Sequence, residues 1–201
     1  LMASMGSVMT FGMNKILMTF SATAIAVFGS YFKLQSFIFM PVFGLNNGMV
    51  PIVSYNYGAQ NKKRLTKTIK LAIMYAVCIM LIGIMLFQFM PDVLLKLFDA
   101  SDHMLEIGIP ALRVISLSFA FAGICIVISS SLQALGHGFL SMMISITRQL
   151  IILLPSAYIL AKFGGIHAVW WSFNIAEIGS LTLSLLFFKH MYNKIIKHLG
   201  E

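Results

Sequence analysis

The stretch PVFGLNNGMVPIVSYNYGAQNKKR, residues 41–64, decides how this chain folds. Residues that bend a helix or carry a polar group recur within an otherwise apolar run: Pro41, Gly44, Asn46, Asn47, Gly48 and Pro51. The run then ends in three consecutive cations, Lys62 to Arg64. Because proline removes a backbone donor and kinks a helix, the stretch predicts a bent helix that ends at a charged boundary.

The composition indicates which solvent surrounds that helix. Of the 201 residues, 59% are hydrophobic and only 10% are charged, and the mean hydropathy is +0.92. Soluble domains usually carry a charge at about a quarter of their positions. A chain with so few charges cannot cover itself in water, so the sequence predicts a protein that lies in a lipid bilayer.

Six apolar segments are long enough to cross that bilayer, since a hydrocarbon core of about 30 Å takes roughly 20 helical residues. They cover residues 2–22, 25–58, 66–89, 104–134, 139–161 and 167–188. Barrel strands would be short and alternating, whereas these runs are continuous. We therefore expect an all-α integral membrane protein with six transmembrane helices in one lobe, residues 1–201. Because Leu1 already lies in an apolar run without a signal peptide, we expect a fragment of a longer chain.

The cations fall unequally on the two sides of this topology. One side is expected to carry eight of them: Lys62, Lys63, Arg64, Lys67, Lys70, Lys189, Lys194 and Lys197. The other side has Lys96 and Lys162, beside three aspartates. Lys and Arg favour the cytoplasm, so both chain ends and the Lys62 loop are predicted to be cytoplasmic. The net charge of +8 then follows from topology, and nucleic acid is excluded as a partner because no basic-aromatic face is present.

The second segment is longer than the membrane needs. Its 34 residues would span roughly 50 Å as a straight helix, so it must tilt, bend or leave the bilayer. Gly44 and Gly48 form a small-residue face that lets another helix approach closely. Asn46 and Asn47 cannot both face lipid. Two interpretations stay open: a bent packed helix with Asn joining helices, or a helix that bends during a conformational cycle and lines a substrate route.

Ionisable groups inside membrane helices cost about 2.5–3.5 kcal/mol each at mid-helix, so each needs a reason. They are Lys15, Lys33, Glu106, Arg113, Arg148 and Glu177. We expect Lys33 to reach toward the interface and Glu106 to lie there. The Asn14–Lys15 pair has either a cavity-facing or a structural role. Arg113 and Arg148 are expected to anchor networks with carbonyls or with Gln133.

Glu177 is the most informative acid because it lies near the middle of the last segment. Asn174 is three residues earlier, so the two share a helical face. A carboxylate that faces a cavity at this depth could carry a proton during transport. The alternative is a buried ion pair with Lys15, Arg113 or Arg148.

The sequence lacks the patterns of an enzyme or a metal site. All five histidines fall at loops or helix ends, and no nucleophile or zinc motif is present. Cys78 and Cys125 have no metal or redox spacing, and we expect both to be buried and inert. Abundant Met and Phe suit a cavity for hydrophobic cations, although most of them will serve packing.

Several ordered motifs resemble one family of transporters. FMPVFGLNNGMVPIVSYNYGAQN, residues 39–61, resembles the second helix of a half-transporter in the multidrug and toxic compound extrusion (MATE) family. Further stretches agree in order: Leu132–Gly136, Thr147–Gln149 with Leu154 and Pro155, and Gly164–Gly165 with Val169–Trp171. The resemblance implies twelve helices in two lobes around a central cavity, of which this chain looks like the C-terminal lobe.

The resemblance also implies a function. Such proteins lie in the plasma membrane, need no cofactor, and export cationic or amphipathic drugs in exchange for protons or sodium ions by alternating access. The partners would be drug-like molecules, the bilayer and a missing N-terminal half. The alternative is a flippase for lipid-linked sugars or polysaccharides. No Asp or Glu occurs in the first segment or in the middle of the fourth, so the acids typical of sodium-coupled relatives are missing.

The sequence thus gives two sets of candidate residues. The substrate or ion pathway candidates are Asn14, Lys15, Asn46, Asn47, Asn174 and Glu177. The structural or gating candidates are Pro41, Gly44, Gly48, Pro51, Arg113, Gln133, Arg148, Gln149 and Pro155.

Overall fold

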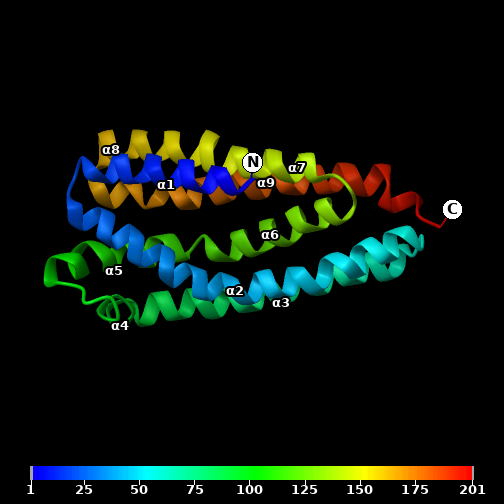
Figure 1. Cartoon of the computed structure of the whole chain (residues 1–201), viewed down its shortest axis with the longest axis horizontal. Coiled ribbons are helices and arrows are strands. Elements are labelled where there is room, and N and C mark those ends of the chain that lie inside the picture. Colours follow the sequence, from blue (N-terminus) through cyan, green and yellow to red (C-terminus); the bar gives the residue numbers. More distant parts are fainter. Residues whose placement is uncertain (1, 201) are drawn as a thin grey trace.

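The computed structural model describes residues 2–200, and these residues are helical nearly throughout (Figure 1). The helices are α1 (Met2–Met18), α2 (Ala22–Gly58), α3 (Lys62–Phe89), α4 (Pro91–Lys96), α5 (Asp102–Ser116), α6 (Phe119–Ala134), α7 (Gly138–Ile146), the π-helix η1 (Thr147–Leu153), α8 (Leu154–Val169), α9 (Trp171–Lys194) and the 3₁₀-helix η2 (Ile196–His198). The part of the chain that the structure describes contains no strand.

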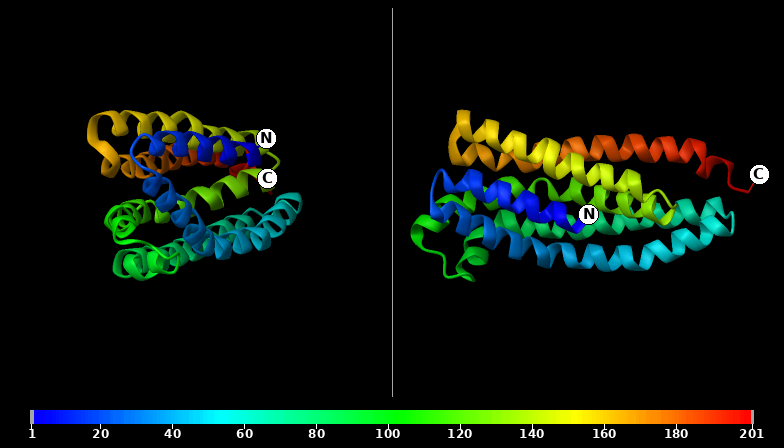
Figure 2. Two further views of the ribbon diagram at one scale, coloured as in Figure 1. Left: turned by 60° about the vertical axis from the view of Figure 1, so that its left-hand side comes forward. Right: turned by 45° about the horizontal axis from the view of Figure 1, so that its top comes forward.

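The helices form an elongated bundle in two groups (Figures 1 and 2). α1, α7, α8 and α9 lie together, and α2, α3, α5 and α6, with the short α4, make up the other group. Within residues 2–200, four helical stretches are long and apolar enough to cross a membrane, and a fifth is added when α5 and α6 count as one bent span. α1 has 17 residues, about 25 Å of helix, which is short of a full hydrocarbon core. The all-helical membrane fold is therefore confirmed, whereas the expected number of six crossings stays a prediction.

α2 is the longest helix and contains the stretch that opened the sequence analysis. Its 37 residues pass through both Pro41 and Pro51 and extend about 55 Å. The Oγ of Ser21 accepts a hydrogen bond from the N–H of Ala24 and begins the helix. After its last residue, Gly58, the backbone of Gln60 has a positive φ of 55°. Asn61 then begins α3 by accepting from the N–H of Arg64 at 3.1 Å.

The predicted single helix over residues 104–134 is wrong, because the chain breaks between α5 and α6 with a bend of 49°. At this break, side chains donate hydrogen bonds to the backbone carbonyls. Gln88 on α3 donates from Nε2 to the carbonyl of Arg113 at 2.7 Å and to the Oγ of Ser116 at 2.9 Å. Ser118 donates its hydroxyl to the carbonyl of Ile115 at 2.7 Å. In an unbroken helix, backbone N–H groups would donate to these carbonyls; at the break, the side chains donate in their place.

The other segment ends also differ from expectation. The fifth segment continues past residue 161 and turns at Gly165, whose φ of 71° and ψ of −169° are not helical. α9 begins at Trp171, later than the predicted residue 167, and extends to Lys194 instead of 188. The short helix α4 was not predicted; Pro91 opens it and Asp92 lies in its first turn.

The core is centred on the packing of α3 against α2 and α6. Phe119 of α6 meets Phe87 of α3 and Phe39 of α2 edge to face, with ring centroids 5.1 and 5.4 Å apart. Small residues let α6 approach closely, since a side chain at Gly123 would lie 2.9 Å from Met80 and 3.4 Å from the carbonyl oxygen of Ala76. This close helix contact replaces the hydrophobic driving force that is missing between helices in lipid.

The two cysteines lie in different environments. Cys125 of α6 is buried, as expected, but Cys78 of α3 is exposed on the outside of the bundle. The buried face of α3 contains Ala76 and Met80, and residue 78 points to the opposite side of a helix with 3.6 residues per turn. The expectation that both thiols are buried is therefore wrong for Cys78.

The fold gathers the cationic segments at one end of the bundle. The α2–α3 loop and the C-terminal residues meet there, with the Nζ of Lys62 donating to the carbonyl of Lys197 at 2.8 Å. The α6–α7 turn is at the same end, because Ser54 near the end of α2 donates its hydroxyl to the carbonyl of Ala134 at 3.0 Å. The turn at Gly165 lies at the opposite end (Figure 1).

We predict that Gly123→Val lowers the free energy of unfolding by about 1–3 kcal/mol, because α6 must move away from the backbone of Ala76. Gly29→Val is the matched control, since a side chain at Gly29 in α2 would meet nothing within 4 Å. Denaturant titration of the purified protein in mild detergent measures both. Equal effects of the two substitutions would contradict this account of the α3–α6 contact.

Candidate functional site

The cavity that borders the only ion pair between helices of the described residues has a volume of about 300 Å³ and lies among α1, α2, α6, η1 and α9. We call it the main cavity, although the groove between α1 and α8 is larger, at about 500 Å³. Six aromatic side chains line it: Tyr31, Phe32, Phe39, Phe43, Phe119 and Phe173. Its polar lining comes from Gln35, Ser36, Ser118, Arg148, Gln149 and Glu177. Aromatic faces attract cations through their quadrupole. The cavity therefore combines apolar walls for a hydrophobic ligand with one positive and one negative side chain.

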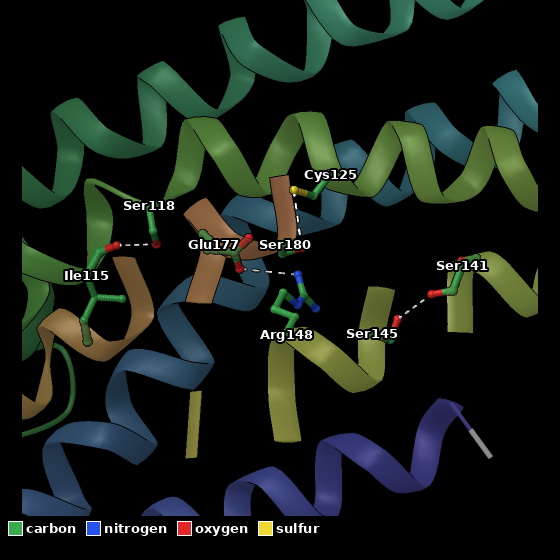
Figure 3. Close-up of polar contacts among 8 residues, drawn as sticks. All are labelled: Ile115, Ser118, Cys125, Ser141, Ser145, Arg148, Glu177 and Ser180. Atoms are coloured by element: carbon green, nitrogen blue, oxygen red, sulfur yellow. Dashed lines mark hydrogen bonds and ion pairs between the residues drawn. The ribbon is translucent and has the colours of Figure 1, made fainter. Parts of the chain in front are cut away.

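Arg148 and Glu177 form an ion pair at this cavity. The Nη1 of Arg148 donates to the Oε1 of Glu177 at 3.4 Å (Figure 3). The side chains are 27% and 14% exposed, respectively, and the second carboxylate oxygen, Oε2, is buried without a hydrogen-bond partner. A distance of 3.4 Å is long for a charge-assisted hydrogen bond. The carboxylate is thus held by one weak bond and keeps an oxygen free for another ligand.

The π-helix η1 explains how Arg148 reaches this position. Pro155 follows η1 in the first turn of α8, and proline can neither donate to the carbonyl four residues earlier, at Ile151, nor fit against it. A wider π turn accommodates that missing bond, and such turns are frequent at functional sites. η1 places Arg148 and Gln149 side by side on the cavity wall, although the Oε1 of Gln149 has no partner.

A second, more polar chamber of about 170 Å³ lies on the other side of Arg148. Five serines line it: Ser129, Ser130, Ser141, Ser145 and Ser180. Gln133 and Cys125 complete its polar wall. Phe43, Ile126 and Arg148 border both this chamber and the main cavity, so these three side chains separate the two spaces.

Two of the asparagine candidates have buried amide atoms that lack a hydrogen-bond partner. Asn46 is 5% exposed, and neither atom of its amide has a partner. The Oδ1 of Asn14 is likewise buried and unpaired. Asn47 is exposed on α2. None of the three lines the main cavity or the polar chamber. Among the six pathway candidates Glu177 alone lines the main cavity, and none of the six lines the polar chamber.

The remaining pathway candidates have separate environments. The Nδ2 of Asn174 donates to the carbonyl of Val114 at 2.8 Å, which ties α9 to α5. Asn174 therefore has a structural contact, although it shares a helical face with Glu177. Lys15 is exposed and lines a groove between α1 and α8, together with Lys162 and Tyr158. Glu177 accordingly pairs with Arg148 and not with Lys15 or Arg113.

The structural and gating candidates are spread over the bundle. Pro41, Gly44, Gly48 and Pro51 are exposed on α2, and a side chain at either glycine would meet nothing within 4 Å. No helix of the described residues packs on this small-residue face. Gln133 donates from Nε2 to the Oγ of Ser141 at 2.8 Å. The side chain of Arg113 is exposed, and only its carbonyl takes part in the hydrogen bonds at the α5–α6 break.

Sequence reasoning missed the serines of the polar chamber and the aromatic walls of the main cavity. A signal for the serines was available, since Ser129–Ser131 interrupt an apolar segment and Ser141 and Ser145 are one helical turn apart. A hydroxyl, however, can bond to its own helix, so a serine in a membrane segment signals far less than a charge does. The walls could not be deduced because they depend on which face each helix presents.

A bundle of membrane-spanning helices with an ion pair beside an aromatic cavity has the architecture of a membrane transporter. Comparison of the sequence with family models places it more narrowly, because the MatE model matches residues 1–159. The chain belongs to the MatE family, whose members are transporters and not enzymes. The resemblance found in the sequence motifs is thereby confirmed.

Individual relatives agree with this assignment. The chain is 28% identical over 187 residues to the multidrug export protein MepA of Staphylococcus haemolyticus, covering 90% of this chain and 40% of that protein. The solved structure of a multidrug resistance MATE family transporter in its outward-facing conformation matches with a TM-score of 0.92 and 22% identity, over 98% of this chain and 45% of the other. An inward-facing counterpart gives 0.89 and 21%, over 96% and 45%. The chain thus spans less than half the length of the relatives it matches.

We predict that Arg148 and Glu177 are energetically coupled. Arg148→Gln leaves a mostly buried carboxylate without its partner, so the free energy of unfolding should fall by on the order of 1–3 kcal/mol. The Arg148→Gln/Glu177→Gln double variant should lose less than the sum of the single variants. Denaturant titration in detergent measures all three, and Arg113→Gln serves as the control with an exposed cation. Additive losses would show that the pair does not act as a unit.

Proposed function

We propose that residues 1–201 form the C-terminal six-helix lobe of a twelve-helix MATE transporter. The coverage of 40–45% of the matched proteins supports one lobe of two. The open face of α2, with Gly44, Asn47 and Gly48 exposed, is the surface on which a helix of the other lobe packs. In this arrangement the four long apolar helical stretches make four membrane crossings, and α1 and the bent pair α5–α6 make the other two.

The complete protein exports cationic or amphipathic drugs in exchange for protons or sodium ions. The observation that carries this proposal is the Arg148–Glu177 pair on the wall of the aromatic cavity. The aromatic rings attract an organic cation, and the carboxylate of Glu177 has one oxygen without a partner. A proton, a sodium ion and a cationic drug would each neutralise the same carboxylate, so the binding of one disfavours the others. A transporter that exchanges a drug for an ion requires such competition between the two for one site.

Alternating access follows from movement of one lobe against the other. This chain matches the inward-facing and outward-facing transporters with nearly equal TM-scores of 0.89 and 0.92, which supports a lobe that moves as a unit. Pro41 and Pro51 allow α2 to adjust its bend as the lobes rock.

The transporter lies in the plasma membrane with the Lys62 loop and the C-terminal end in the cytoplasm. The excess of Lys and Arg at that end of the bundle supports this orientation. The same end contains the Lys62–Lys197 hydrogen bond, so the loop and the C-terminal tail must lie on the same side of the membrane.

We expect residues 1–201 alone to give no drug resistance, because one lobe provides one wall of the central cavity and has nothing to rock against. Co-expression with the missing N-terminal half should restore resistance to a cationic aromatic compound such as ethidium. Growth and ethidium efflux in a host that lacks its own exporters measure this. Full efflux from this chain by itself would contradict the half-transporter proposal, and transport of a lipid-linked sugar without any drug export would support the flippase alternative.

In the complete transporter, Glu177→Gln should reduce drug export about tenfold or more and alter its pH dependence, since a loss of 1.4 kcal/mol at the site already amounts to a factor of ten. The amide keeps the shape of the side chain but cannot take up a proton or a charge. Glu106→Gln is the matched control, because Glu106 is 79% exposed and bonded only to His103. Efflux rates at several pH values, at equal protein levels, decide; an unchanged rate and profile would remove Glu177 from the mechanism.

A further inference from the structure

We propose that the serine-lined chamber is a hydrated access route that connects the Arg148–Glu177 pair to water at the end of the bundle that carries the Lys62 loop. The inference deepens the proposed function, since it gives the coupling cation or proton a path to Glu177 that does not pass through the aromatic cavity. It depends on the geometry of the chamber, and its test does not depend on drug export.

The chamber has apolar side chains, Phe43, Ile126 and Ile144, but enough polar groups beside them to bind water. Five hydroxyls, an amide and a guanidinium line a space of about 170 Å³. Liquid water occupies about 30 Å³ per molecule, so the space has room for about five waters. A water needs two to four polar partners, and the spacing of the serines supplies them on both the α6 wall and the α7 wall.

Side-chain hydrogen bonds connect Gln133, Ser141 and Ser129, and Ser145 lies one helical turn from Ser141 toward Arg148. Gln133 donates to Ser141 at 2.8 Å, and the Oγ of Ser141 donates to that of Ser129 at 3.2 Å. One turn further, the Oγ of Ser145 donates to the carbonyl of Ser141 at 3.2 Å (Figure 3). Arg148 is the next residue of this helical face, three positions after Ser145. The polar groups therefore follow one line from Gln133 to the ion pair.

The outer end of this line lies at the surface of the bundle, where the proposed route meets water. Gln133 is exposed in the last turn of α6, immediately before the turn to α7. That turn is at the end of the bundle that carries the Lys62 loop, as the bond from Ser54 to the carbonyl of Ala134 shows. Water that enters beside Gln133 thus reaches the serines directly.

The inner end of the line is the ion pair itself. The titratable groups whose charges act on Glu177 or feel it are Arg148 on η1, Tyr31 on α2 and Cys125 on α6. Arg148 borders both spaces, whereas Glu177 and Tyr31 face the main cavity and Cys125 faces the chamber. Arg148, Phe43 and Ile126 are then the barrier between the two spaces, and displacement of Arg148 from Glu177 opens the carboxylate to the chamber.

Cysteine accessibility tests this route in the complete protein. In a background with Cys78→Ser, Cys125→Ser and any other native cysteine replaced, Ser145→Cys and Ser129→Cys place a thiol on the α7 and α6 walls, respectively. Lys63→Cys defines the side of the membrane that the Lys62 loop faces. Ser172→Cys is the matched buried control, since Ser172 is 0% exposed and donates its hydroxyl to the carbonyl of Val169 at the end of α8. The probe is a charged, membrane-impermeant methanethiosulfonate, applied from either side of sealed vesicles.

The route requires that Ser145→Cys and Ser129→Cys react from the same side of the membrane as Lys63→Cys. Because thiol reactivity follows access to water, both should also react on the order of tenfold faster than Ser172→Cys. The two positions are independent, so a variant that fails to fold leaves the other to decide. Reaction no faster than the buried control, or reaction only from the side opposite Lys63→Cys, overturns the route. Loss of ethidium export with intact labelling would count against the proposed function and leave the route standing.

Discussion

The cost of a charge inside a bilayer is the constraint on which the site depends. Arg148 and Glu177 lie in membrane-spanning segments, where each charge alone would cost several kcal/mol. Their single contact of 3.4 Å and the unpartnered Oε2 of Glu177 leave much of that cost uncompensated. Such an arrangement survives only where the surroundings are polar or where a ligand completes the coordination. The cavity on one side and the serine chamber on the other supply those surroundings.

The same constraint explains where the helices are irregular. Backbone groups without partners are too costly in lipid, so breaks occur only where other groups replace the lost bonds. At the α5–α6 break these groups are Gln88, Ser116 and Ser118. At η1 the irregularity precedes Pro155 and directs Arg148 toward Glu177. The irregular backbone therefore borders the cavity and the core, while the long helices α2 and α3 are continuous.

Sequence alone predicted which segments are helical better than which way each side chain points. The long apolar segments follow from length and hydropathy, and each of them is helical in the structure. The central position of Glu177 is not reproduced, because α9 begins at Trp171 and Glu177 lies in its second turn. The partner of Glu177 stayed open among three cations, because hydropathy does not say which way each helix is turned about its axis. The bonds at the α5–α6 break come partly from Ser116 and Ser118 within the segment and partly from Gln88, which is 25 residues away from Arg113. The second contribution cannot be deduced from residues 104–134.

The guanidinium of Arg148 has enough donors to form hydrogen bonds in both the main cavity and the serine-lined chamber. A guanidinium has five donors in a rigid fork, yet the contact to Glu177 uses one of them. The others are available to the hydroxyl side of the barrier, where Ser145 and Ser180 lie. On the proposed mechanism, a cation that neutralises Glu177 weakens the hold on Arg148, and the guanidinium then turns toward the chamber, where water compensates its charge. On this mechanism one bond links the two events, because neutralisation of the carboxylate weakens the Arg148–Glu177 contact and loss of that contact opens the barrier.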